Sequence, residues 1–153
     1  MKYKNLSYYF IFIILFCFSN AACKKDPSTT IKTVYQGDLG FYSQSDLNNF
    51  SKDYTTINGH ITIQARNSNE ITDLSPLSNI RKINGNLTIS SCDGLISLKG
   101  VENIAEIQTL RINYNEDLKD ASALANIKIN EVIEITYNKE LLDLPLLKNV
   151  NYL

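Results

Sequence analysis

The sequence is poor in the residues on which catalytic and metal sites depend. It has one histidine, His60, and three cysteines in 153 residues, and no two cysteines stand at metal-binding spacing. It also lacks a glycine-rich phosphate loop, and its pattern brings no nucleophile, base and orienting residue together. The sequence therefore predicts a protein that is not an enzyme and that carries no metal or cofactor.

The few residues that could carry such chemistry have simpler interpretations. We expect His60 to be a solvated strand residue, in preference to a ligand or a general base. Three aspartates in predicted turns lack the alternating carboxylate spacing of a calcium loop. These residues, Asp117, Asp120 and Asp143, are therefore expected to be solvated as well.

The apolar run near the N-terminus is too short to span a membrane. Tyr8–Phe18 has 11 residues (18 − 8 + 1), whereas a membrane-spanning helix needs roughly 20. Lys2 and Lys4 precede the run and small residues follow it, a layout typical of a signal peptide that is removed. Residues 1–22 are predicted to be this signal peptide.

The residues around the expected cleavage point suggest a lipid anchor. Ala21 and Ala22 directly before Cys23 resemble the lipobox of bacterial lipoproteins. The resemblance implies that Cys23 is acylated and that the protein sits on a membrane without crossing it. Because Lys24 follows the cysteine in place of a retention aspartate, it also implies the outer membrane, periplasmic or surface-facing. The alternative is an ordinary secretory signal in which Cys23 is incidental.

Charge and cysteine count limit the mature chain further. Residues 1–22 hold two lysines and no acidic residue, so 15 − 2 = 13 basic and 16 acidic side chains remain, a net charge of −3 that does not favour nucleic acid. Cys92 is left without a disulfide partner. Residues 23–33 contain few apolar side chains and are expected to be a tether. Residues 34–153 are long enough for one domain.

A repeat of constant length organises the chain from Ile83 to Val150. Leu87 recurs as Leu110 and then as Ile133, because 110 − 87 = 23 and 133 − 110 = 23. The same shift relates three sets of apolar residues spaced by three: Leu95, Leu98, Val101 and Ile104; Leu118, Ala121, Leu124 and Ile127; Leu141, Leu144, Leu147 and Val150. Self-similarity at a fixed period is typical of a solenoid.

Less regular copies precede this repeat. Ile61–Ile63 starts one copy at a longer interval (87 − 61 = 26), and Gly37–Phe41 is a degenerate opening strand (61 − 39 = 22). A short helix is expected next, with Ser45 as its N-cap and with Leu47 and Phe50 on one face. In a solenoid such a helix would cover the open end of the first coil.

Each repeat predicts a short strand followed by a return limb. The strands alternate inward and outward, and stacked repeats would pair them in parallel about 4.8 Å apart. Apolar spacing of three on the return limb favours 3₁₀-like turns over a long α-helix. Cys92, Asn115 and Asn138 follow the strands at a position expected to turn inward, where an amide can satisfy backbone groups left unpaired. Arg66 and Asn67 occupy that position in the first copy.

The repeat units resemble a known family. Ile83–Ile89 followed by Leu95, Leu98, Gly100 and Val101 look like the receptor L-domain repeat, a relative of leucine-rich repeats. The resemblance implies an α/β solenoid, a right-handed coil with one parallel sheet, short 3₁₀ or helical return limbs and an N-terminal capping helix. Thr109 and Glu131 stand where the family has glycine, which predicts looser bends in the later copies.

A solenoid usually binds through the outward face of its sheet, so we expect a recognition module for a protein or a glycan there. Tyr114 and Tyr137 are related by the same shift (137 − 114 = 23) and should stack beside Arg111, Asn113 and Glu134. The alternative is a tyrosine ladder that only stabilises the sheet.

Two other interpretations of the whole protein stay open. It could be a structural component of the cell envelope, or an incomplete solenoid finished by self-association. The second follows from the strand Val132–Thr136, for which no following repeat and no C-terminal cap is visible in the sequence.

Overall fold

The computed structural model describes residues 33–67 and 69–145. These residues form an eight-stranded sheet in which every strand pairing is parallel. The strands are β1 (Val34–Gln36), β2 (Leu39–Phe41), β3 (Thr56–Asn58), β4 (Ile61–Gln64), β5 (Lys82–Ile83), β6 (Leu87–Ser90), β7 (Glu106–Asn113) and β8 (Lys128–Thr136). The short helices are α1 (Gln44–Asn48), η1 (Ser75–Leu77) and η2 (Ser122–Leu124). This arrangement is compatible with a solenoid-like α/β fold.

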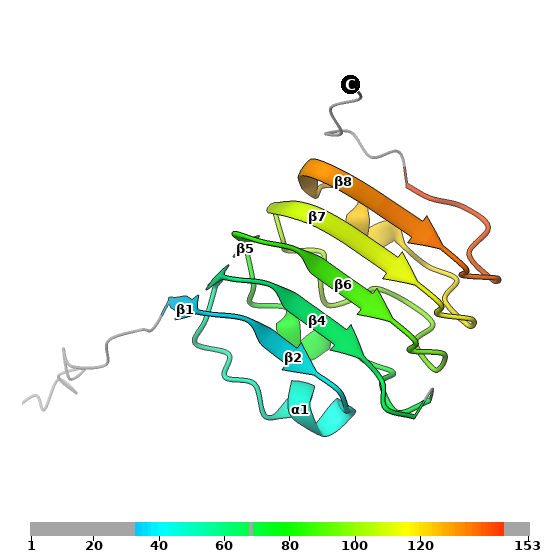
Figure 1. The fold of residues 1–153 in the computed structure, drawn as a ribbon, viewed down its shortest axis with the longest axis horizontal. Helices are drawn as coiled ribbons and strands as arrows, with labels where there is room; N and C mark the ends of the chain where they lie inside the picture. The colour runs from blue at the N-terminus through cyan, green and yellow to red at the C-terminus, as the bar shows by residue number, and fades with distance from the viewer. Residues whose placement is uncertain (1–32, 68, 146–153) are drawn as a thin grey trace, which may run out of the picture. The chain divides into compact units, whose positions relative to one another are not determined.

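The strand registers follow the spacing of the sequence. Leu87 of β6 pairs with Leu110 of β7, which pairs with Ile133 of β8. Ile61 of β4 pairs with Leu87 despite the longer interval, and Leu39 of β2 pairs with Ile61, so the predicted opening strand is confirmed. Side by side, β2, β4, β6, β7 and β8 form the face seen in Figure 1.

A second row of short strands lies on the N-terminal side of a bend. β3 pairs with β1 on one side and with β5 on the other, and β7 is long enough to pair with both β5 and β6. At the bend, a Cβ atom on Gly85 would collide with the carbonyl oxygen of Gly59, so a side chain is excluded where successive backbones approach this closely.

The expectation of looser bends at Thr109 and Glu131 is wrong. Both residues lie inside continuous strands, β7 and β8. A residue with a side chain cannot bring its backbone as close to the carbonyl of the preceding repeat as Gly85 does. The chain at Thr109 and Glu131 therefore stays extended. The pairing of β7 with β8 adjusts instead by a register shift between Ile107 and Thr109, a β-bulge.

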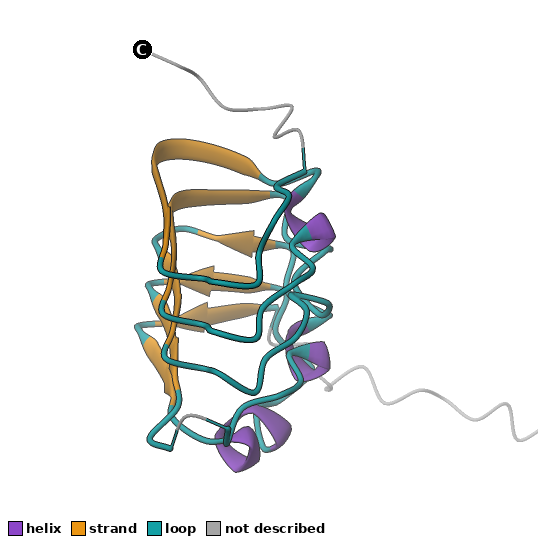
Figure 2. Ribbon diagram, turned by 90° about the vertical axis from the view of Figure 1, so that its right-hand side faces the viewer, coloured by secondary structure: helices purple, strands orange, loops and turns teal. Residues whose placement is uncertain are grey.

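The core lies between the sheet and the return limbs, with the short helices on the limb side (Figure 2). Inward residues of β4 and β6 are buried, and so are the apolar residues spaced by three on the first three return limbs. Two of those limbs contain 3₁₀ turns, η1 and η2, as the spacing predicts. On the fourth limb Leu141 is half-buried and Leu144 is exposed, while Leu147 and Val150 lie outside the described residues.

The end of the sheet at β2 is covered by α1 (Figure 1). The predicted N-cap, Ser45, is wrong, because Ser43 occupies that position. Ser43 Oγ accepts from the N–H of Asp46, whose carboxylate accepts from the N–H of Tyr42, so the two side chains cap the first turn together. These hydrogen bonds, that from Tyr42 above all, hold the pKa of Asp46 below its ordinary value.

An aromatic cluster extends this cover. Phe50 packs against Phe41 and Tyr54 with ring centroids 5.4 and 5.8 Å away, and Tyr35 lies edge-on to Tyr54 at 5.2 Å. Leu47 of α1 is fully buried beneath it. Across residues 33–67 and 69–145, no helix is long and apolar enough to cross a membrane.

Candidate functional site

The outward face of the sheet carries two columns of polar side chains. Strand pairing aligns Thr62, Thr88, Arg111 and Glu134 in one column and Gln64, Ser90, Asn113 and Thr136 in the next. The alternating burial of β4, β6 and β7 places these side chains on the solvent side. The face is therefore made of hydroxyl, amide and charged groups at fixed spacing.

Arg111, Asn113 and Glu134 are brought together as the sequence predicts. Arg111 Nε lies 3.3 Å from one carboxylate oxygen of Glu134, and the amide of Asn113 donates to the other oxygen at 3.3 Å. Thr136 Oγ1 donates to Asn113 Oδ1 at 3.1 Å. This network orients the polar groups of β7 and β8 on the outward face.

The residue that follows each of the last three strands adopts the left-handed conformation. Ser91, Tyr114 and Tyr137 have φ of 55°, 58° and 55°. The N–H of Ser91 donates to the carbonyl of Asn113, and the N–H of Tyr114 donates to that of Thr136, so the three residues stand in one column. A left-handed residue at this point sends its own side chain outward and turns the next residue inward.

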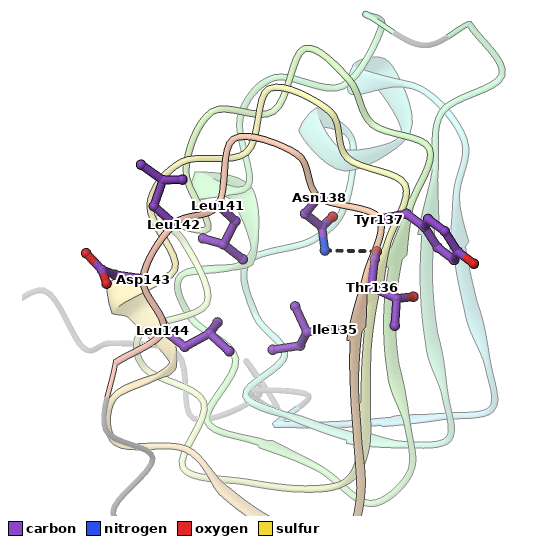
Figure 3. Close-up of a pocket in the computed structure, with 8 residues that line it drawn as sticks. All are labelled: Ile135, Thr136, Tyr137, Asn138, Leu141, Leu142, Asp143 and Leu144. Atoms are coloured by element: carbon purple, nitrogen blue, oxygen red, sulfur yellow. Dashed lines mark hydrogen bonds between the residues drawn. The ribbon is translucent and has the colours of Figure 1, made fainter.

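Tyr114 and Tyr137 stack in this column. Their ring centroids are 4.6 Å apart and the ring planes differ by 6°. The separation matches the spacing of neighbouring strands, since each ring leaves the backbone at the same point and angle. Both rings are exposed, Tyr114 by 54% and Tyr137 by 69%, and Figure 3 shows Tyr137 pointing away from the interior.

Behind the tyrosines, Cys92, Asn115 and Asn138 form an inward ladder. Asn115 Oδ1 accepts from the N–H of Cys92 at 3.0 Å, and Asn138 Oδ1 accepts from the N–H of Asn115 at 3.0 Å. The amide of Asn115 also donates to the carbonyl of Ile89, and that of Asn138 to the carbonyl of Ile112. The two asparagines thereby tie successive repeats together at the point where the strands end.

The ladder begins at Cys92. Arg66 and Asn67, which the sequence places in the equivalent position, are exposed, whereas Ala65 directly after β4 is buried. The Cys92 thiol donates to the carbonyl of Ser90, and burial raises its pKa to about 11. A thiol held in this state is a weak nucleophile, consistent with a packing role.

His60 and Asp120 are exposed, as the sequence predicts, although His60 lies just before β4 and not within a strand. His60 lies in the bend before β4. Its Nδ1 accepts from the backbone N–H of Asn86 at 3.0 Å, and its backbone N–H donates to the Asp38 carboxylate at 2.7 Å. Asp120 accepts from Ser122 N–H at 2.8 Å and from Ser97 Oγ at 3.0 Å. Hydrogen bonds from Ser122 and Ser97 hold the pKa of Asp120 below its ordinary value.

These two exposed side chains also accept hydrogen bonds from backbone N–H groups, and Asp117 and Asp143 are exposed as predicted. In the part of the chain that the structure describes, no three His, Cys, Asp or Glu side chains are placed to hold a metal ion.

The end of the sheet at β8 differs from the covered end at β2. Within the described residues β8 pairs with β7 alone, and its inward residues Ile133 and Ile135 are only half-buried. A cavity of about 330 Å³ opens beside Ile135 and is lined also by Leu141 and Leu144 (Figure 3). This end exposes both a strand edge and apolar side chains.

Sequence reasoning missed two features of this region. Ser91 shares the column and the conformation of the tyrosines, and its offset from Tyr114 (114 − 91 = 23) is the signal that would have found it. It also missed the ion pairs of Glu106 with Lys82 at 2.9 Å and Lys128 at 3.7 Å. These pairs join the ends of β5, β7 and β8, where the sequence analysis identifies only a bend.

Comparison of the sequence with protein-family models and with curated proteins finds no match. Cys23 and the rest of residues 1–32 lie outside the described residues. The functional interpretation therefore depends on the chemistry of the outward face and on the sequence of the N-terminal segment.

Proposed function

We propose that this protein is a non-catalytic recognition module that binds a protein or a glycan through the outward face of its sheet. The observation that carries the proposal is the exposed, stacked pair Tyr114 and Tyr137 beside the network of Arg111, Asn113 and Glu134. Aromatic rings offer contact area at small entropic cost, and fixed polar neighbours give direction to binding.

The same proposal includes the fold family. Parallel strands that recur at near-constant intervals along the sequence, 3₁₀ return limbs and a helix over one end support a right-handed solenoid of the leucine-rich-repeat or receptor L-domain type. In such a fold the outward sheet face is the usual binding surface, because each repeat adds side chains in fixed columns. The tyrosine column of this chain is one of them.

The proposed location rests on residues 1–33. The signal-like segment 1–22, the lipobox-like residues before Cys23 and the polar segment after it favour a lipid-anchored protein at the outer membrane, periplasmic or at the cell surface. A tether of this kind would leave the sheet face free to meet a ligand. Protease added to intact cells separates the two orientations, since only a surface-facing protein would be digested.

Binding by the tyrosine pair is tested with the full-length protein on a glycan array and against intact cells. Tyr114→Ser combined with Tyr137→Ser should abolish binding while lowering the thermal midpoint little. Thr62→Ser, on the same face but distant from the tyrosines, is the matched control. Binding that survives in the double variant, together with a clear loss of stability, would leave the tyrosines as a ladder only.

A second candidate function has an observation of its own. The edge of β8 that has no partner among the described residues, with Val132 exposed and a cavity between Ile135 and Leu144, favours self-association. A structural component of the cell envelope would use this edge and leave the tyrosine face without a ligand. Sedimentation of the full-length protein in detergent distinguishes the candidates, since an obligate oligomer without measurable ligand binding would favour the second.

A further inference from the structure

We infer that the face of Tyr114 turned toward Ser91 is the platform of a subsite for a pyranose ring. This inference rests on the proposed function and names its ligand as a carbohydrate. Three residues of one column have the left-handed conformation. Two of them are tyrosines, and the other, Ser91, has a much shorter side chain.

The geometry of the column defines the free space. Tyr137 covers one face of Tyr114 at a centroid distance of 4.6 Å. The opposite face points toward Ser91, one strand spacing away, and a CH₂OH side chain is too short to cover a phenol ring. Among the described residues Tyr137 is the one aromatic neighbour of Tyr114, which remains 54% exposed. A planar group placed over Ser91 would continue the stack as its third ring.

The chemistry around this space favours a sugar over an apolar side chain. Ser90 precedes Ser91 at the end of β6, and Asp93 lies two residues beyond it, with a carboxylate oxygen that accepts from the N–H of Glu116 at 3.3 Å. Ser90, Ser91 and Asp93 are all partly exposed. These hydroxyl and carboxylate groups can pair with the hydroxyls of a sugar, whereas an apolar side chain has no polar group to offer them.

A pyranose ring suits both the exposed aromatic face of Tyr114 and the polar side chains around it. The axial C–H groups of one ring face are apolar and pack on an aromatic ring, while the equatorial hydroxyls project sideways toward donors and acceptors. Ser90 and Asp93 flank Ser91 in the sequence and are partly exposed, so polar side chains lie near this position to pair with the hydroxyls of the sugar.

The stack also supplies rigidity. Tyr114 is fixed by the ring of Tyr137 on one side and by the buried side chain of Asn115 next to it in sequence. A platform that is ordered before the ligand arrives loses less conformational entropy on binding than a free side chain does.

The test replaces Ser91 with tyrosine, the residue found at the other two positions of the column, and so fills the subsite. Ser91→Tyr places a third tyrosine in a backbone conformation that Tyr114 and Tyr137 already adopt, so the variant should fold and extend the stack. Chitohexaose, cellohexaose and maltohexaose are titrated into the full-length protein by calorimetry, in a detergent that contains no sugar. For whichever oligosaccharide binds to wild type, Ser91→Tyr should weaken the binding by about tenfold or more. This equals the loss of one aromatic contact of about 1.4 kcal/mol.

Two further variants separate the subsite from the rest of the face. Ser91→Ala leaves the platform open and should bind within about threefold of wild type, which is under about 1 kcal/mol. Thr62→Tyr adds a tyrosine on the same face away from the column and should bind as wild type does. If Ser91→Tyr binds as tightly as wild type while the double tyrosine-to-serine variant does not bind, the subsite is refuted and the proposed function stands. If none of the three sugars binds to wild type, the carbohydrate assignment is overturned, and binding to cells still tests the proposed function.

Discussion

Asn138 Oδ1 accepts two hydrogen bonds from Asn115, one from its backbone N–H and one from its side-chain amide, each at 3.0 Å. Asn115 is fully buried, and its amide also reaches the carbonyls of Ile89 and Asn113 at 3.2 Å. One side chain thus satisfies backbone groups at the ends of two neighbouring strands and contacts the ladder residue that follows a third. The inward ladder also fixes the position of the tyrosine column, because each tyrosine directly precedes a ladder residue in the sequence.

Replacing Asn115 with alanine should therefore destabilise the protein. The change leaves the buried N–H of Cys92 without its acceptor and removes a donor to the carbonyl of Ile89, at a cost of about 1–3 kcal/mol. Urea unfolding followed by circular dichroism measures the loss. Asn138→Ala is the matched control and should cost less, because Asn138 is partly exposed and water can replace its bonds. Equal stability of wild type and Asn115→Ala would contradict the ladder.

Amide exchange should be faster in β8 than in β6. β6 lies between β4 and β7, whereas β8 pairs with β7 alone among the described residues, and Ile133 and Ile135 are only half-buried. Strands with one partner and little buried surface open locally at lower free energy. Hydrogen exchange read by mass spectrometry resolves the two segments in a monomeric sample. Slower exchange in Lys128–Thr136 than in Leu87–Ser90 would show that something covers this edge.

Acid should weaken the protein in part through Glu106. The hydrogen bond from Lys82, with help from Asn130 and Lys128, lowers the pKa of Glu106 from its ordinary value of 4.5 to about 2. A carboxyl group with a lowered folded-state pKa stabilises the fold above its unfolded pKa. That contribution is lost as pH falls from about 4.5 toward about 2. Because the group is solvent-accessible, the effect should be modest and should shrink in high salt.

The thermal midpoint measured at intervals from pH 5 to pH 2 checks this, with Glu106→Gln as the comparison. The wild-type advantage over Glu106→Gln should be present at the upper end of the range and should vanish at the lower end. An advantage that is constant across the range would exclude a titrating Glu106 as its source.

Cys23→Ala should release the protein from membranes. The residues before Cys23 resemble a lipobox, and acyl chains bind a bilayer in proportion to the methylenes they bury. Fractionation of cells followed by immunoblotting gives the distribution. Cys17→Ala, within the predicted signal peptide, is the matched control and should stay in the membrane fraction. Unchanged association of Cys23→Ala with membranes would refute the acylated anchor.

The main strands and the tyrosine stack were predictable because both follow from the length of the repeat. One constant step brings Leu87, Leu110 and Ile133 into register, and the same step must bring Tyr114 and Tyr137 within one strand spacing of each other. The 3₁₀ turns followed from apolar spacing of three in the same way. Repeats make long-range contacts readable from sequence, since each position has an equivalent in the next strand.

Other features were not predictable because they depend on local geometry. Ser43 and Ser45 are equally suitable N-caps by residue type, and only Ser43 places Asp46 where it can accept from the N–H of Tyr42. The left-handed conformation of Ser91 carries no signal in its residue type, since serine lacks the preference that marks asparagine or glycine, and only its offset from Tyr114 (114 − 91 = 23) links it to the column. β5 is two residues long, too short for an alternating pattern to identify.

Gly85→Ala should disrupt the bend between the two strand rows. A methyl group at this position would overlap the carbonyl oxygen of Gly59, and the strands on either side of both glycines pair with neighbouring repeats, so the two backbones cannot easily separate. Overpacking of this kind costs about 1–3 kcal/mol. Gln108→Ala is the matched control, because Gln108 lies within the continuous strand β7, where side chains are accommodated, and its N–H still donates to the carbonyl of Gly85. Urea midpoints of the two variants give the comparison, and a Gly85→Ala protein as stable as Gln108→Ala would mean that the backbone can separate at the bend without loss.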